Sequence, residues 1–508
     1  MLRFTVNNNG GANESVKLDG AYLVGSDNVP LRADIQSKGN EFICNTKAGG
    51  PAALALVWPV KGGGRMVLET TRLPERDQPY NLQVELLRGR LMRIAQKRED
   101  WGLFDFEGIE EVAKLIDLAR DQLIAALQAD TPAQAAEIAD NGIAMAIRAS
   151  EQLTAFHAEI FLNRRKQVAG FPKRLLGTRI NPKSTDASVR ELIPKSCDFI
   201  SIPFSWRDIE PREKELNWQA TDDWIDWASR HHIPVRGSGL VSFTKSNVPD
   251  WLYIWEHDFE AIRDLVYEHL TRVIKRYGQY VSVWDVISGI HAANCFQFNF
   301  EQLMELTRMA VSVAKQTAPR SLAVIDIVMP WGEYYANNQR TIPPMLYAEM
   351  VMQNGLNFDA FGVQCCLGVG AEGRYVRDIF SISSMLDRFA NFGKPVHVTG
   401  IQVPSAPSVG AGDAWEGKVA ASAGGAWHRD WSPEIQRAWM RRVYHIALSK
   451  PFIESLTWQD FCEDNAHFLP HAGLVCADGK PKPAYEELVE IKRDLGGDTD
   501  GHATRSAG

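Results

Sequence analysis

The spacing of hydrophobic and polar positions changes twice along the chain, and each change marks a new region. Over residues 1–98, short runs alternate in hydrophobicity or are rich in β-branched side chains, with Gly, Asn and Pro between them. A period of two is typical of strands. The predicted strands are Leu2–Val6, Ser15–Leu23, Ala52–Val60, Arg65–Thr71 and Tyr80–Leu87. We expect a small β-sandwich over residues 1–98, serving either to bind carbohydrate or to pack against the rest of the chain.

Beyond Gly108 the apolar residues recur three and four positions apart, which is the period of an amphipathic helix. Val112, Leu115 and Ile116 begin this pattern, Pro132 interrupts it, and a second helix follows to about Arg165. The pattern predicts a helical hairpin over residues 105–168. A coiled-coil seam between two copies is the alternative, so the hairpin is a candidate for oligomerisation.

From residue 172 to 495, apolar strands alternate with amphipathic helices. Eight such βα units predict an α/β protein with a (β/α)8 TIM barrel. Residues 496–508 are polar and are expected to be disordered. The predicted strands are Leu175–Ile180, Phe199–Phe204, Pro234–Leu240, Ser282–Ile287, Leu322–Ile327, Ala360–Cys365, Pro395–Ile401 and Ser455–Phe461. Helices including Asp222–His231, Phe259–Arg276, Glu301–Thr317 and Pro433–Leu448 lie between them.

Four segments in this region resemble glycoside hydrolase family 10, the β-1,4-xylanase family. Residues 394–403 (KPVHVTGIQV) resemble its seventh strand, and residues 283–289 (VWDVISG) resemble its fourth. Residues 431–436 (WSPEIQ) and 479–485 (GKPKPAY) are similar to its eighth-repeat helix and to its closing segment. The resemblance implies a TIM barrel, a hydrolase of O-glycosyl bonds and a β-linked polysaccharide as partner, with no cofactor.

Both catalytic glutamates of that family are missing. The resemblance places the nucleophile at Gly400 and the acid/base at Gly289. A glycine can neither attack an anomeric carbon nor transfer a proton. The third strand, residues 237–243 (GSGLVSF), also lacks the histidine and tryptophan with which the family holds the sugar. We therefore expect that standard retaining hydrolysis of xylan is lost.

Other carboxylates could have replaced the missing pair. Asp326 ends the fifth strand, Glu333 follows soon after it, and Asp460 follows the eighth. Groups on opposite walls could act by inversion, which needs roughly 6.5–9.5 Å between two carboxyls. Glu333 is the favoured substitute because aromatic residues surround it in sequence. The opposing interpretation is that these carboxylates cap helices or face solvent.

Aromatic and amide side chains supply the candidates for sugar binding. The family resemblance singles out Trp206, Gln364 and Trp458, and two more aromatics, Trp331 and Tyr334, flank Glu333. The long loop from Pro404 to Trp431, rich in Gly and Ala, predicts a lid over the barrel mouth. Its tryptophans, Trp415 and Trp427, are candidate contacts.

Cysteines and histidines near the predicted strand ends could bind zinc, but no CxxC or HxxxH pair supports this interpretation, and we predict no metal. The residues considered are Cys295, Cys365, Cys366, Cys462, His291 and His397. Seven cysteines without framework spacing favour free thiols.

The net charge of −8 is spread along the chain without a basic stripe, which argues against nucleic acid as a partner. The sequence has no apolar run long enough to span a membrane, and its first residues lack the apolar core of a signal peptide. This favours a cytoplasmic protein or one whose leader is absent from this chain.

Three functions remain open from the sequence. The first is a pseudoenzyme that binds a glycan or a partner in the former cleft. The second is a glycoside hydrolase with relocated carboxylates. The third is a structural or assembly protein.

Overall fold

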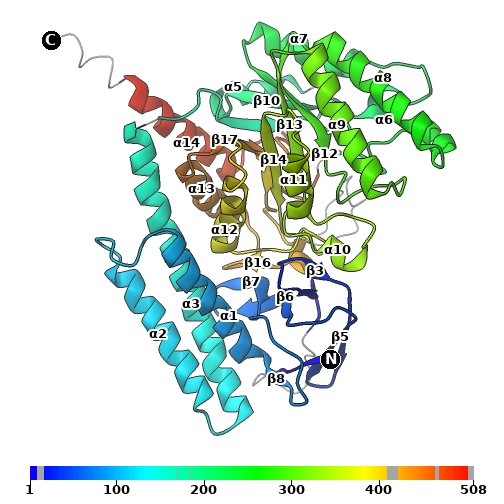
Figure 1. Cartoon of the computed structure of the whole chain (residues 1–508). Coiled ribbons are helices and arrows are strands. Elements are labelled where there is room, and N and C mark those ends of the chain that lie inside the picture. Colours follow the sequence, from blue (N-terminus) through cyan, green and yellow to red (C-terminus); the bar gives the residue numbers. More distant parts are fainter. Residues whose placement is uncertain (8–16, 169, 185, 409–420, 464–467, 501–508) are drawn as a thin grey trace.

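The computed structural model describes residues 1–500 except 8–16, 169, 185, 409–420 and 464–467. Its larger part is a closed barrel of eight parallel strands in the order β10-β11-β12-β13-β14-β15-β17-β9 (Figure 1). All eight predicted strands are present, and the TIM barrel is confirmed. Their bounds are β9 Leu176–Arg179, β10 Phe199–Pro203, β11 Val235–Ser238, β12 Val281–Ser288, β13 Leu322–Ile327, β14 Ala360–Cys366, β15 Val396–Gln402 and β17 Ile453–Trp458.

Helices surround the barrel, and several of them begin at side-chain caps. Asp258, for example, accepts a hydrogen bond from the backbone N–H of Ala261 at 3.0 Å and starts α8. The helices and 3-10 turns are α4 Ala187–Arg190, α5 Ile193–Ser196, α6 Trp206–Ile209, α7 Gln219–Arg230, η1 Asp250–Trp255, α8 Phe259–Tyr277, α9 Phe300–Thr317, α10 Tyr334–Asn337, α11 Pro344–Gln353, α12 Ile379–Ala390, η2 Ala421–Gly424, α13 Pro433–Ser449 and α14 Pro483–Asp500.

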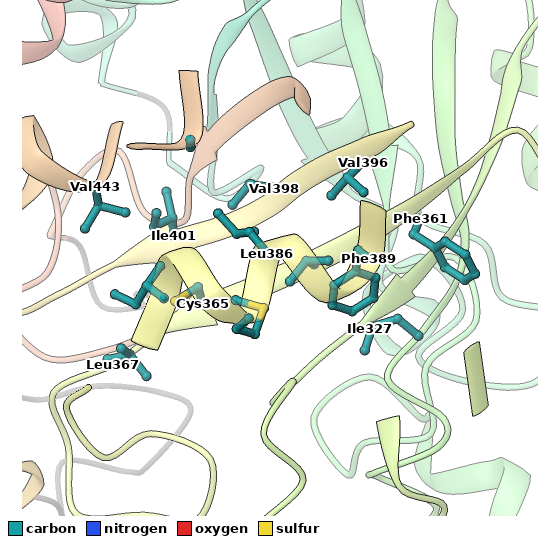
Figure 2. Packing of buried hydrophobic residues seen from close by; sticks show 14 of the residues in the cluster. Ile327, Phe361, Cys365, Leu367, Leu386, Phe389, Val396, Val398, Ile401 and Val443 are labelled. Carbon is teal, nitrogen blue, oxygen red and sulfur yellow. The ribbon is translucent and has the colours of Figure 1, made fainter. Parts of the chain in front are cut away.

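The core between barrel and helices is illustrated by α12, which lies over β14 and β15 (Figure 2). Leu386 and Phe389 of α12 are buried among outward-facing residues of the two strands. The ring of Phe389 meets that of Phe361 edge-on, with centroids 6.1 Å apart. Beyond Val398, the register between β15 and its neighbouring strands shifts. Val398 and Ile401 therefore both face the apolar layer beneath the helices, while Thr399 faces the inside of the barrel and contacts Asp326.

The N-terminal region forms two sheets, with strand orders β4-β5-β1-β8 and β16-β7-β6-β2-β3. Their strands are β1 Leu2–Thr5, β2 Tyr22–Val24, β3 Pro30–Leu31, β4 Ala33–Lys38, β5 Glu41–Thr46, β6 Ala53–Val60, β7 Gly64–Glu69, β8 Tyr80–Asn81 and β16 Ala426–Trp427. The predicted strand Tyr80–Leu87 is wrong. After two residues of strand, the chain enters α1, Leu82–Asp100, whose first six residues are all buried.

The two helices predicted after Gly108 are α2, Glu110–Leu127, and α3, Pro132–Val168. Helix α1 packs against both, so the unit has three helices rather than two. Figure 1 shows α3 running from this bundle to the barrel, where it contacts α13. No helix within the described residues is long and apolar enough to cross a membrane.

The N-terminal sheets are joined to the barrel through its loops. Strand β16, which belongs to the loop after β15, pairs antiparallel with β7. The close approach requires glycine, since a Cβ at Gly64 would lie 2.3 Å from the backbone oxygen of Ala426. Arg90 of α1 forms a fully buried ion pair with Asp378, 2.7 Å apart, at the start of α12. The described N-terminal region is therefore part of the same packed body as the barrel.

Candidate functional site

The carboxyl ends of the barrel strands surround a cavity of about 330 Å³. Its wall combines apolar surface with many hydroxyl and amide side chains, which the ends of several strands and the loops after them contribute. Residues at its base include Ser288, Gly289, Asp326, Gln364, Thr399 and Gln459. Charged residues in the wall are Arg179, Lys183, Asp208, Asp285, Arg374 and Asp460. This is the position at which TIM-barrel enzymes carry their chemistry.

Asp326 is the centre of the base. Asp326 is 2% exposed, and its carboxylate accepts hydrogen bonds from side chains on three other strands, β12, β14 and β15. Ser288 Oγ donates to Oδ2 at 2.5 Å, Gln364 Nε2 donates to the same oxygen at 3.0 Å, and Thr399 Oγ1 donates to Oδ1. A buried carboxylate with three donors is held in one orientation, which suits a structural anchor better than a mobile acid.

A second buried charge lies beside it. Asp285 accepts from Arg236, whose Nε lies 3.0 Å from Oδ1, and Arg236 Nη1 in turn reaches Ser455 Oγ at 3.5 Å. Burial raises the pKa of Asp285 to about 6, while the Arg236 guanidinium opposes that rise. The Arg236–Asp285 ion pair is therefore buried inside the barrel, close to Asp326.

A side chain at either of the two glycines in the expected catalytic positions would meet a neighbouring side chain at close range. Gly289 has a φ of +64°, and a Cβ there would lie 2.8 Å from Val328 Cγ2. A Cβ at Gly400 would lie 2.4 Å from Gln459 Oε1. Gln459, on the neighbouring strand end, is 1% exposed and occupies the space. The site is therefore rebuilt around the glycines instead of being an intact site with two side chains removed.

Glu333, the favoured substitute acid, does not line this cavity. Its Oε1 accepts a hydrogen bond from Arg377 Nη2 at 2.5 Å, and Arg377 also donates to Tyr22 Oη of β2 at 2.9 Å. Arg377 lies over the ring of Trp331, 4.7 Å from its centroid. The carboxylate thus holds the barrel to the N-terminal sheet, which removes the geometric basis for predicting a general acid here.

The other aromatic candidates are also buried outside the cavity wall. Trp206 stacks on His269 with centroids 4.5 Å apart, and Tyr334 Oη lies 2.7 Å from His291 Nδ1. Trp458 donates to the backbone oxygen of Ala472 at 2.9 Å. Their rings pack in the protein interior, so none is available as a sugar platform.

Residues 409–420 of the predicted lid lie outside the described residues, so only the ends of this loop can be placed. Its described end forms β16, and Trp427 donates from Nε1 to Glu151 of α3 at 2.8 Å. Trp415 lies outside the described residues. The described end of this loop therefore connects the barrel to the N-terminal sheet and to α3.

Three of the predicted residues do share the cavity, namely Asp326, Gln364 and Asp460. Asp460 Oδ2 accepts from the backbone N–H of Phe468 at 2.7 Å. Sequence reasoning missed Ser288 and Thr399, although each directly precedes one of the two glycines. Arg179 ends β9, where the rule that sites lie at strand ends could have found it. Arg374 lies in a loop after β14 and carries no such signal.

The cysteines and histidines considered for zinc do not converge. Within the described ranges, no group of three potential ligands has the geometry to hold a metal ion. Cys365 and Cys366 are buried, and burial raises the pKa of the Cys366 thiol to about 12. They are small apolar residues of the barrel wall.

Comparisons with known proteins bear on this barrel. The family model for glycosyl hydrolase family 10 matches residues 168–491. Among curated relatives, endo-1,4-beta-xylanase B of Thermotoga neapolitana is 21% identical over 311 residues, covering 57% of this chain and 78% of that protein. Endo-1,4-beta-xylanase A of Xylanibacter ruminicola is 32% identical over 84 residues, covering 16% of this chain and 22% of that protein.

A solved structure, native xylanase 10B from Thermotoga maritima, is similar over 64% of this chain and 96% of its own. The sequence identity is 16% and the TM-score is 0.48.

Proposed function

Since the chain belongs to glycosyl hydrolase family 10, we propose that it binds a glycan in the barrel cavity without cleaving it by double displacement. The observation that carries this proposal is the space at Gly400. A retaining glycosidase forms a covalent glycosyl intermediate on a carboxylate. Position 400 offers no such atom, and the Gln459 side chain occupies the space that one would need.

The chemistry of the cavity wall supports binding of a polyhydroxylated ligand. Ser205, Ser238, Ser242, Thr244 and Asn247 all contribute to the wall. Hydroxyls both donate and accept hydrogen bonds, and an amide offers two donors and an acceptor, which matches the alternating needs of sugar hydroxyls. A polar concave site of this kind fixes the orientation of a ligand through a few directed contacts.

A second candidate, hydrolysis by relocated carboxylates, is favoured by one observation. Asp326 and Asp460 both line the cavity and follow different strands. However, three donors already hold Asp326. If hydrolysis does occur, Asp460→Asn should abolish it while leaving glycan binding in place.

The test is a calorimetric titration with a panel of β-linked oligosaccharides, combined with chromatography of the same mixtures for released products. Ser242→Trp would fill the cavity, and Ser229→Trp on an exposed position of α7 is the matched control. We expect binding by the wild type and Ser229→Trp, and affinity at least about tenfold lower for Ser242→Trp, which corresponds to ~1.4 kcal/mol. Products with retained anomeric configuration, or a panel in which nothing binds, would overturn the proposal.

A further inference from the structure

Arg374 is a buried cation in the cavity wall. Its side chain is 6% exposed, and Nη1 donates to the backbone oxygen of Cys366 at 3.3 Å. Nε is buried and has no hydrogen-bond partner. No carboxylate among the described residues forms an ion pair with it. The guanidinium lies over the ring of Phe468, 4.8 Å from the centroid, and that ring also lines the cavity.

A buried charge of this kind is costly unless an opposite charge compensates it. The nearest ionisable neighbours of Arg374 do not provide one. Burial raises the pKa of Cys365 and Cys366 far above neutrality, so both are uncharged thiols. Glu333 is already paired with Arg377. Among the described residues, no neighbouring group therefore balances the charge of Arg374.

Arg179, at the end of β9, adds a second guanidinium to the same wall. Its side chain makes no hydrogen bond or ion pair with the part of the chain that the structure describes. The positive charge of Arg179 nevertheless lowers the pKa of Asp285, which is another residue of the cavity wall. Lys183, the remaining cation of the wall, is different because Asp208 pairs with it at 2.9 Å.

The acidic residues of the cavity already have donors of their own. Asp285 is bound by Arg236, and Asp326 accepts from three side chains. Asp460 accepts from a backbone N–H. Their negative charges nevertheless remain near the two arginines, since Asp326 and Asp460 both raise the pKa of Cys366 while Arg179 and Arg374 lower it. A ligand with one negative charge fits this field better than a doubly charged one.

We propose that Arg374 and Arg179 form a subsite for a carboxylate, so that the preferred glycan carries a uronic acid. This inference rests on the proposed binding of a glycan. A guanidinium matches a carboxylate because its planar fork can donate two parallel hydrogen bonds, and the bonds are strengthened by charge.

The experiment compares two ligands of equal length, a neutral xylo-oligosaccharide and the same oligosaccharide carrying one glucuronic acid branch. Free glucuronate and inorganic phosphate are added as competitors to separate an acidic glycan from a general anion site. The proteins are wild type, Arg374→Gln, Arg179→Gln and the control Arg308→Gln, which removes one exposed cation on α9.

For the wild type and Arg308→Gln, we expect the acidic ligand to bind at least about tenfold tighter than the neutral one, as charge-assisted hydrogen bonds allow. The preference should fall to about onefold in Arg374→Gln and to an intermediate value in Arg179→Gln, and it should weaken with added salt. Circular dichroism shows whether Arg374→Gln folds. If it does not, Arg179→Gln, at a partly exposed position, decides the question.

Equal binding of both ligands by the wild type would overturn the carboxylate subsite but leave glycan binding standing. Failure of both ligands to bind would overturn the proposed function itself. Competition by phosphate or free glucuronate at the same concentration as the acidic oligosaccharide would show a small-anion site and would also refute the inference.

Discussion

The interpretation of Gly400 makes a quantitative prediction for stability. Gly400→Ala places a methyl group where Gln459 Oε1 lies 2.4 Å from the ideal Cβ position. Gln459 is 1% exposed, so turning its side chain towards the cavity that it lines gives up the contacts that now bury it. Overpacking of this kind costs about 1–3 kcal/mol. The smaller entropy of the unfolded alanine chain returns about 0.4–1 kcal/mol, so the expected net loss is roughly 1–2 kcal/mol.

The prediction becomes specific in the background of Gln459→Ala, which removes the crowding group. The Nε2 atom of Gln459 is buried without a partner, so the change sacrifices little hydrogen bonding there. In that background Gly400→Ala should be neutral or stabilising by up to about 1 kcal/mol. The coupling energy between the two substitutions should therefore be about 1–3 kcal/mol, a size typical of residues in direct contact.

Equilibrium unfolding in urea, read by the shift of the midpoint at constant slope, measures all four proteins. Two glycines provide controls. Gly49 has open space around its Cβ position, so Gly49→Ala should not destabilise either background. Gly289→Ala should destabilise both backgrounds equally because its φ of +64° is strained for any side chain. A Gly400→Ala effect that is the same with and without Gln459 would refute the reasoning.

Three further predictions concern the joints of the fold. Glu333→Gln should lower the free energy of unfolding by about 3 kcal/mol, because it leaves Arg377 buried without its counter-charge. Glycan affinity, measured by titration, should be unchanged. A loss of glycan binding at unchanged stability would contradict the structural role of Glu333. His428 has a pKa raised by its hydrogen bond to Glu151, so its contribution is present below its unfolded pKa and lost as the pH rises through the higher folded pKa. His428→Gln should therefore lower the unfolding midpoint at about pH 5.5 and leave it unchanged at about pH 9; equal shifts at both would refute the pairing. Deletion of residues 1–169 should prevent cooperative unfolding of the barrel, and a native near-ultraviolet dichroism spectrum from the fragment would show the opposite.

Much of the barrel could be predicted because buried parallel strands are continuous apolar runs that differ clearly from amphipathic helices. The start of α1 could not, since its apolar positions 82, 84, 86 and 87 fit both periods and every side of this segment is buried. The pairing of β16 with β7 joins residues more than 350 positions apart, and no local pattern encodes it.

The residues of the candidate site also differ in how far the sequence could place them. Asp326, Gln364 and Asp460 follow strands whose ends must meet at the mouth, so topology alone brings them together. Glu333 and Tyr334 lie a few residues further along a loop, where the N-terminal sheet rather than the cavity determines which way they face. The sequence therefore predicts which side chains face the cavity only for residues close enough to the strand end for the strand to fix their orientation.

The most direct test is mass spectrometry of the protein mixed with a fluorinated xyloside inhibitor that traps the covalent intermediate of retaining glycosidases. The same sample is measured first under native conditions and then after denaturation. The account predicts a non-covalent complex in the native spectrum and the unmodified protein mass after denaturation, because no nucleophilic carboxylate is present at position 400. A stable added glycosyl mass after denaturation would contradict it.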